Sequence, residues 1–179
     1  MTTVCPSIAG VSGLRRGARA GRWICGLLLL GGCVLPSESA SPGTGLRVSH
    51  ITEISLERDC NGCVSGSVLV LRRDGTASLT MTGHARSGTD DKISKGKVSS
   101  KDFEALARLA VAQGFFDMDD VYEDAQLQDG SWATTGITRG GHEKRVFRRD
   151  AAGPTGLKKI EAAIDAAKAR IVFSPSTGH

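Results

Sequence analysis

Aromatic side chains are scarce in this sequence, and its excess of positive charge is confined to one end. The 179 residues include only two Trp, one Tyr and five Phe. Four of the 23 basic residues and none of the acidic residues lie in positions 1–32, so 19 basic and 19 acidic residues share the rest of the chain. Binding of nucleic acid needs a basic surface, usually with aromatic rings on which bases stack. We therefore expect no nucleic-acid partner.

Long apolar runs are missing as well. The strongest apolar stretch, Trp23–Gly32, is far shorter than the roughly 20 residues that a membrane-spanning helix needs. It follows Arg15, Arg16, Arg19 and Arg22, and a basic region before a short apolar region is typical of a secretory signal peptide. Residues 1–32 are therefore predicted to be a leader that is removed.

The end of this apolar stretch predicts a lipid anchor. Leu30-Gly31-Gly32-Cys33 places two small residues before a cysteine, the pattern at which bacterial lipoproteins are acylated and cleaved. Cys33 is then the lipidation site and the first mature residue, and its partner is the lipid bilayer. Because Leu35 is not the Asp that retains many lipoproteins in the inner membrane, the outer membrane is the favoured location.

Two other export routes stay open. An ordinary signal peptide cut near Ser39-Ala40 would leave a secreted or periplasmic soluble protein. Arg15-Arg16 also invites a twin-arginine interpretation, although the apolar residues expected directly after the pair are absent. All three routes place the mature protein outside the cytoplasm.

The mature chain is predicted to hold one domain. Residues 33–46 are rich in Ser, Pro and Gly and cannot bury apolar surface, so they are expected to form a flexible tether. Residues 47–172 suffice for one hydrophobic core but not comfortably for two. Residues 173–179 are expected to be a disordered tail.

The first part of the domain predicts strands. Thr52, Ile54 and Leu56 alternate with polar residues, as in a strand with one buried face. Residues 67–73 and 76–82 flank Asp74-Gly75, which predicts a hairpin with a two-residue type I′ turn. The pairs that this turn sets opposite each other on one face are Val70 with Leu79 and Val68 with Met81. Residues 83–97 are expected to be a loop with three solvated lysines, Lys92, Lys95 and Lys97.

Two helices and a second hairpin are predicted further along. The first helix follows a capping pair, Ser99 and Asp102, and stops at Gly114; its apolar positions are Phe103, Leu106, Ala107 and Ala110. Phe115-Phe116 should then enter the core. A hairpin runs from about residue 133 to 147 and turns at Gly140-Gly141. The last helix has Pro154 in its first turn and the apolar positions Leu157, Ile160, Ile164, Ala167 and Ile171.

The order of these elements indicates the fold class. Strand, hairpin, helix, hairpin and helix follow one another, so we expect an α+β fold. Its sheet is expected to be antiparallel, with about five strands and two helices packed on one face. The hairpin-helix arrangement occurs twice, although the residues themselves show no repeat.

Several short motifs follow one another in a distinctive order between Ile51 and Ile171. They are the run Ile54–Cys63, the Asp74-Gly75 turn, Gly114-Phe115-Phe116, Tyr122 and Asp129. This order resembles a bacterial family of unknown function, domain of unknown function family 6438. The family's cysteines are one residue further apart than Cys60 and Cys63 in this chain. The resemblance implies no activity, since the family has none assigned.

Cys60 and Cys63 are the most tempting chemical feature of the domain. An exported Cys-x-x-Cys pair can be a thiol-disulfide exchange centre, which needs a helix starting at the first cysteine to lower the thiolate pKa. Here Val64-Ser65-Gly66 leads into a strand instead. We expect a structural disulfide that holds the corner between two strands. Redox exchange, metal ligation and free thiols are the alternatives.

Patterns for metal binding and catalysis are weak, so no metal and no cofactor are expected. The acidic residues Asp117, Asp119, Asp120, Glu123, Asp124 and Asp129 lack the central glycine of an EF-hand. His50, His84 and His142 are scattered and lack a second cysteine pair for zinc. No Gly-x-Ser-x-Gly motif or glycine-rich phosphate loop occurs.

The leading hypothesis is therefore a non-catalytic envelope lipoprotein that acts as a structural or interaction module. An envelope protein is its possible partner. The alternative function is a thiol-disulfide redox factor that uses Cys60 and Cys63. A small-molecule binder is the third possibility, and a convergent polar pocket would support it.

Overall fold

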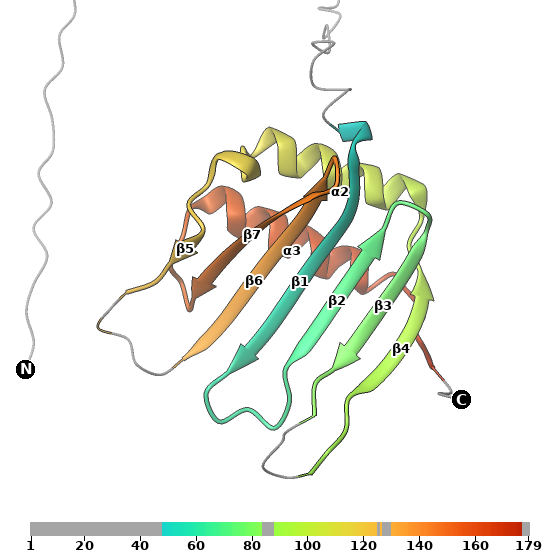
Figure 1. Cartoon of the computed structure of the whole chain (residues 1–179), viewed down its shortest axis with the longest axis vertical. Coiled ribbons are helices and arrows are strands. Elements are labelled where there is room, and N and C mark those ends of the chain that lie inside the picture. The colour runs from blue at the N-terminus through green and yellow to red at the C-terminus, as the bar shows by residue number, and fades with distance from the viewer. Residues whose placement is uncertain (1–47, 84–87, 125, 127–129, 177–179) are drawn as a thin grey trace, which may run out of the picture. The chain divides into compact units, whose positions relative to one another are not determined.

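The computed structural model (Figure 1) describes residues 48–83, 88–124, 126 and 130–176. The predicted leader 1–32, the lipidation site Cys33 and the predicted tether 33–46 lie outside these residues. So do two residues weighed above, His84 and Asp129. No helix among the described residues is both long enough and apolar enough to cross a membrane.

The described part of the chain forms one eight-stranded sheet. Its spatial order is β5-β7-β6-β1-β2-β3-β4-β8, and every neighbouring pair is antiparallel except β5 and β7. The strands are β1 (Ile51–Cys60), β2 (Ser67–Arg72), β3 (Thr76–Met81), β4 (Lys92–Lys97), β5 (Val121–Tyr122), β6 (Ser131–Arg139), β7 (His142–Arg149) and β8 (Ser174–Pro175).

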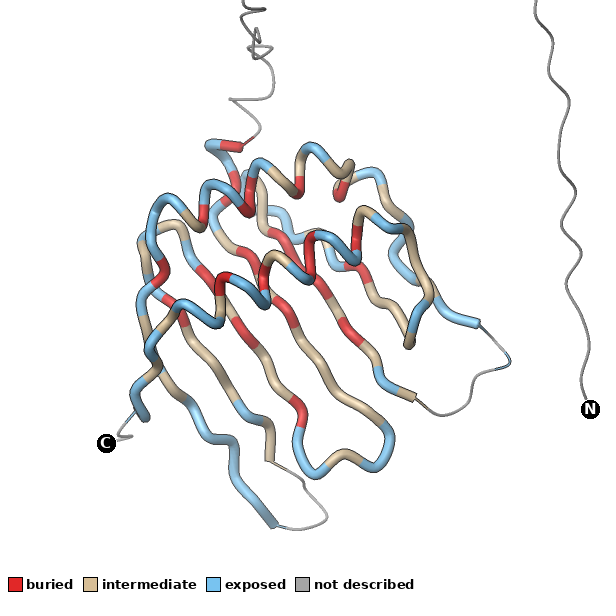
Figure 2. The backbone as a smooth tube through the Cα atoms, turned by 180° about the vertical axis from the view of Figure 1, so that it is seen from behind, coloured by how far each residue is buried: buried red, intermediate tan, exposed pale blue. Residues whose placement is uncertain are grey.

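Two helices, α2 (Ser100–Ala112) and α3 (Thr155–Lys168), cover one face of this sheet, as Figures 1 and 2 show from opposite sides. The expected α+β class with two helices on one face is confirmed, but the expectation of five strands was too low. Two of the three additional strands, β5 and β8, have two residues each and are too short for a periodic pattern. The third, β4, replaces part of the predicted loop 83–97 and also separates the first hairpin from α2.

The first hairpin has a different register from the one predicted. Leu69 pairs with Leu79 and Leu71 with Ala77, so three residues, not two, form the turn. The N–H of Gly75 donates to the carbonyl of Arg72 at 3.0 Å, and Gly75 has a φ of +89°. A three-residue loop that ends in a glycine with positive φ is typical of a type I turn closed by a glycine bulge. Because a one-residue shift exchanges the two faces of a strand, Leu69 and Leu71 share a face with Leu79 in place of Val68 and Val70, and both leucines are buried.

The predicted alternation in β1 holds only for part of the strand. Ile54 and Leu56 are buried as expected, but Thr52 is exposed and Ile51 is fully buried in its place. The pairing with β6 shifts between Ile51 and Glu53, which marks a β-bulge. A bulge adds one residue to one strand and so reverses the alternation.

Local signals located α2 correctly. The Ser99 side chain accepts a hydrogen bond from the N–H of Asp102, and the four predicted apolar residues are the buried ones. Gly114 follows the helix with a φ of +68°. Phe115 is fully buried in a short 3₁₀ helix, η2 (Phe115–Asp117), whereas Phe116 is half-buried and meets it edge to face.

The second hairpin turns at Gly140-Gly141, where both residues have positive φ, as predicted. In α3, Pro154 is the N-cap and not part of the first turn, and the helix ends before Ile171. The expected tail departs most from the prediction, because Ser174 and Pro175 pair with β4 as β8. The chain therefore still belongs to the sheet beyond the predicted end of the domain at 172.

The core lies between the sheet and the two helices (Figure 2). Its largest fully buried apolar side chains are Phe103, Phe115, Ile51, Ile54, Leu71, Ile137, Leu157, Ile160 and Ile164. These come from both helices, from η2 and from the central strands. The opposite face of the sheet carries no helix in the described part of the chain.

Candidate functional site

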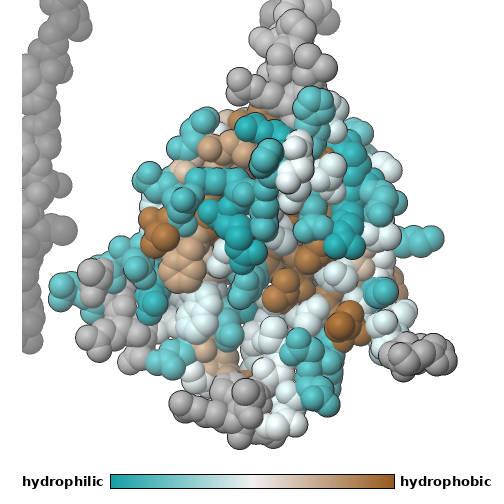
Figure 3. Space-filling model, viewed as in Figure 1, coloured by the Kyte–Doolittle hydropathy of each residue, from teal (hydrophilic) through white to brown (hydrophobic). Residues whose placement is uncertain are grey.

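The candidate site is the face of the sheet that the helices leave uncovered. Side chains alternate along each strand, so residues that neighbour the buried ones point to this face. On the central and left-hand strands they include Glu53, Ser55, Glu57, Val68, Val70, Arg72, Thr134, Gly136, Thr138, Glu143, Arg145 and Phe147. Figure 3 looks onto this face, where apolar patches lie between strongly polar ones.

Charged side chains on the uncovered face pair across strands. Arg145 on β7 contacts Glu57 on β1 at 3.1 Å and Glu143 on its own strand at 3.3 Å. Gly136 on β6 makes room for this group, because a Cβ there would collide with Ser55 Oγ and would lie 2.7 Å from Glu143 Oε1. Because Gly136 has no side chain, the carboxylate of Glu143 can pack against the sheet.

A second ion pair lies on the same face near the β2–β3 turn. Arg72 Nε donates to Glu53 Oε2 at 2.8 Å, and this hydrogen bond and the negative charge of Glu53 raise the pKa of Arg72 above its ordinary value. In the turn itself, Asp74 accepts from the hydroxyl and the N–H of Thr76 at 2.7 and 2.8 Å. These bonds to the ionised carboxylate lower the pKa of Asp74.

Three shallow hollows open on the uncovered face, with volumes of about 200, 410 and 720 Å³. The two smaller hollows flank Arg72 and Asp74 at the β2–β3 turn. The 720 Å³ hollow lies over β6 and β7, and we name it the Phe147 hollow. Its lining residues are Asp120, Thr134, Glu143, Lys144, Arg145 and Phe147.

Cys60 and Cys63 lie at the end of β1, in the connection to β2. Their sulfur atoms are within bonding distance, with 5.3 Å between the Cα atoms. The N–H of Cys63 donates to the carbonyl of Cys60 at 3.3 Å, and Gly62 supplies the positive φ of +82° that the turn needs. Strand β2 follows at Ser67, and no helix begins in residues 60–66. This places the expected disulfide at the corner between two strands.

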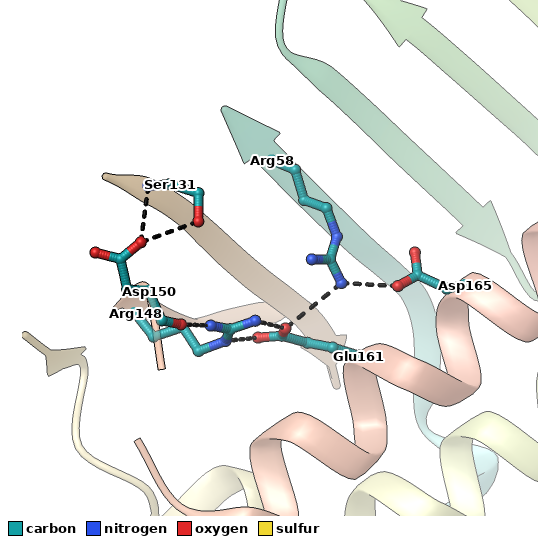
Figure 4. Close-up of polar contacts among 6 residues, drawn as sticks. All are labelled: Arg58, Ser131, Arg148, Asp150, Glu161 and Asp165. Atoms are coloured by element: carbon teal, nitrogen blue, oxygen red, sulfur yellow. Dashed lines mark hydrogen bonds and ion pairs between the residues drawn. The ribbon is translucent and has the colours of Figure 1, made fainter. Parts of the chain in front are cut away.

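An ion cluster around the buried Glu161 ties β1 and β7 to α3 (Figure 4). Glu161 has only 2% of its side chain exposed, and Arg148 donates to both of its carboxylate oxygens, at 2.8 and 2.5 Å. Arg58 approaches Glu161 at 3.5 Å and Asp165 at 2.8 Å. The hydrogen bond with Glu161 raises the pKa of Arg148. Another guanidinium nitrogen of Arg148 donates to the carbonyl of Asp150.

Sequence reasoning missed both the Phe147 hollow and this ion cluster. The cluster had a usable signal, because Glu161 lies four residues after Leu157 on the apolar stripe of α3 and so had to be buried against a cation. The sequence held no such signal for the hollow, since its lining residues come together only through strand register and the pairing of β5 with β7.

The residues considered above as metal ligands do not form a cluster in the described part of the chain. Among the described residues, no group of three or more His, Cys, Asp or Glu side chains is arranged to hold a metal ion. Asp120 pairs with Lys144 and Glu123 contacts Arg149 at 3.5 Å. His50 and His142 are both exposed, at the sheet end where β6 turns into β7.

Comparison with known proteins finds no match, either among protein-family models or among curated proteins. The resemblance to domain of unknown function family 6438 therefore stays a prediction that rests on motif order. In the structure, Asp74-Gly75 forms the β2–β3 turn, Gly114 follows α2 and Tyr122 lies in β5.

Proposed function

We propose that this protein is a membrane-anchored envelope lipoprotein whose folded domain binds a partner and catalyses no reaction. The uncovered face of the sheet is the proposed binding surface. One observation carries the proposal: both helices pack on the same face, so the other face of the eight-stranded sheet carries no helix in the described part of the chain. An antiparallel sheet commonly has one face on the core and one in solvent, and such a face is available to a partner.

The electrostatics of this face support binding. Arg72 and Arg145 are each held by a neighbouring carboxylate, which fixes their guanidinium groups in place before any partner arrives. Preorganised side chains lose less conformational entropy on association than free ones. The hollows are shallow and open, which favours a surface ligand over a deeply enclosed substrate.

The start of the domain is well suited to an anchored protein. Arg73 donates to the carbonyls of Val48 and Ile51, both at 2.6 Å, and its guanidinium lies 5.2 Å from the centre of the Phe103 ring. The N–H of Gly140 donates to the carbonyl of His50 at 3.0 Å. Both hairpin turns thus hold the segment that would connect to an acylated Cys33.

The anchor is tested on the mature amino terminus. The full chain is expressed in a Gram-negative bacterium, and the envelope-bound protein is analysed by intact-mass and peptide mass spectrometry. We expect a first residue Cys33 that carries acyl chains, and a Cys33→Ser variant that is neither acylated nor cleaved after Gly32. A full-length chain with an unmodified leader in the cytosol would refute the proposal.

The binding face is tested with matched arginine substitutions in full-length Cys33→Ser protein. Thr80→Arg alters the uncovered face on β3, and Glu104→Arg alters the solvent side of α2. Each protein is sedimented with purified cell-envelope fragments. We expect Thr80→Arg to reduce co-sedimentation and Glu104→Arg to leave it unchanged. Equal behaviour of the two variants would count against this face.

A thiol-disulfide exchange factor is the second candidate function, and the bonding distance between the Cys60 and Cys63 sulfurs favours it. The strand after Cys63 is unfavourable, because no helix dipole stabilises a thiolate at Cys60. The protein is assayed for oxidation of a reduced, unfolded model protein. Acceleration that Cys60→Ser abolishes would establish the redox function, and its absence would favour the binding module.

A further inference from the structure

We infer that the Phe147 hollow is a carbohydrate site, which binds an uncharged pyranose sugar of an envelope glycan. The inference rests on the proposed function, because it names the ligand class for one part of the uncovered face. Its support is the set of residues that line the hollow, the pairing of their charges, the aromatic ring of Phe147 and the pairing of β5 with the neighbouring strand edge.

The charges of the residues that line the hollow cancel one another, and Arg145 also contacts Glu57 outside the lining at 3.1 Å. Four of its six lining residues are ionised side chains, and they form two ion pairs, Asp120 with Lys144 and Glu143 with Arg145. Selecting a charged ligand would need an excess charge of the opposite sign, and this lining provides none. Carboxylate and guanidinium groups in fixed pairs still offer acceptors and donors in planar arrangements. Such a surface suits the hydroxyl groups of an uncharged sugar.

Phe147 is the one apolar residue among those that line the hollow. Phe147 is half-buried and points to the uncovered face, since its neighbour Val146 is fully buried on the other face. In register with Phe147, Val121 on β5 leaves 53% of its surface exposed, and Thr134 on β6 presents a hydroxyl. A pyranose ring has an apolar C–H face and a polar rim, so it matches an aromatic ring with hydroxyl and ionic groups around it.

The neighbouring strand edge argues against a peptide. Proteins often capture an extended peptide by adding it as a strand to an open sheet edge. At Phe147 and Arg148 that edge is already occupied, because the N–H of Phe147 donates to the carbonyl of Asp120 at 2.8 Å and β5 pairs with these two residues of β7.

The test measures binding of neutral oligosaccharides to full-length Cys33→Ser protein by NMR titration and calorimetry. The probes are chitotetraose with four N-acetyl groups, cellotetraose and maltotetraose. At least one should bind and shift backbone signals of β6 and β7. Phe147→Leu should weaken binding about tenfold, since it removes the ring and keeps an apolar side chain.

Two further variants separate a binding effect from misfolding. Thr134→Val removes one hydroxyl at nearly constant volume and should also weaken binding, with the melting temperature recorded for every variant. The matched control is Ser78→Ala, which alters the separate 200 Å³ hollow on the same face and should bind as the parent does. Equal loss in Ser78→Ala, or unchanged binding in both Phe147→Leu and Thr134→Val, would overturn the inference.

Other outcomes also decide the question. Binding of none of the three sugars, tighter binding of a sugar phosphate than of the neutral sugar, or signal shifts at β7 with an unstructured peptide would each overturn the carbohydrate assignment. Failure here is distinguishable from failure of the proposed function. If envelope co-sedimentation still depends on Thr80, the binding face stands and only the ligand class is wrong.

Discussion

Arg148 on β7 donates two parallel hydrogen bonds to Glu161 on α3, Nε to Oε1 at 2.8 Å and Nη2 to Oε2 at 2.5 Å. The glutamate is 2% exposed and the arginine 15%. This pair fixes α3 against one end of the sheet, and Arg58 reaches the same carboxylate from β1. Two-point contact between planar groups sets direction as well as distance.

Removing one partner of this pair should destabilise the fold. Glu161→Gln leaves Arg148 and Arg58 without their buried counter-charge, so the free energy of unfolding should fall by about 3 kcal/mol. Urea denaturation measures the change. Glu104→Gln, at the exposed ion pair with Arg108, is the control and should cost less than about 0.5 kcal/mol. Replacing Glu161 and Arg148 together by Met should recover most of the loss, and no recovery would contradict this account.

Asp102 should make stability depend on pH in the acid range. Hydrogen bonds from Arg170 and from Ser99 lower its pKa below the ordinary 3.8. A carboxyl group with a lowered folded-state pKa stabilises the fold above its ordinary pKa, and the contribution disappears as pH falls through the folded-state value. Asp102→Asn should therefore cost about 0.5–1 kcal/mol at pH 7 and progressively less below pH 3.8.

Urea unfolding of wild type and Asp102→Asn from pH 7 down to pH 2 measures this convergence. Asp119→Asn is the control, because the structure gives its carboxylate no hydrogen bond or ion pair among the described residues. A difference between wild type and Asp102→Asn that is constant across the whole pH range would show that the charge of Asp102 is not responsible.

Replacement of Thr135 by an apolar residue should increase the stability of the fold. Its side chain is fully buried on β6, and its hydroxyl has no hydrogen-bond partner among the described residues. Thr135→Val keeps the shape and removes the unsatisfied group, so it should stabilise the fold by about 1 kcal/mol. Calorimetric melting measures the gain, with Thr138→Val on the uncovered face as the comparison. A lower melting temperature for Thr135→Val would mean that the hydroxyl is satisfied.

The register of the first hairpin can be tested with two adjacent alanines. Leu69 is 2% exposed in the core, whereas Val68 lies on the uncovered face. Leu69→Ala should cost about 2–5 kcal/mol through the cavity it leaves. Val68→Ala should cost less than about 1 kcal/mol. The reverse order of the two losses, measured by urea denaturation, would restore the register that a two-residue turn predicts.

Short-range signals in the sequence were enough to determine the local elements of this protein. Ser99, Asp102 and Gly114 bounded α2, and Gly140-Gly141 located the second turn, because caps and turns depend on residues a few positions apart. The α+β class followed from the order of these elements. The lipid anchor at Cys33 stays a prediction of the same local kind.

Only the tertiary structure decided what joins distant parts of the chain. The register of Leu69 with Leu79, the strand β4, the edge strands β5 and β8, and the ion pair of Arg148 with Glu161 depend on residues that are far apart in the sequence. The Phe147 hollow is of this type, since Asp120 and Thr134 reach it from different strands or edges. Pairing energy between strands depends on the partner strand, so no periodicity within one segment could specify it.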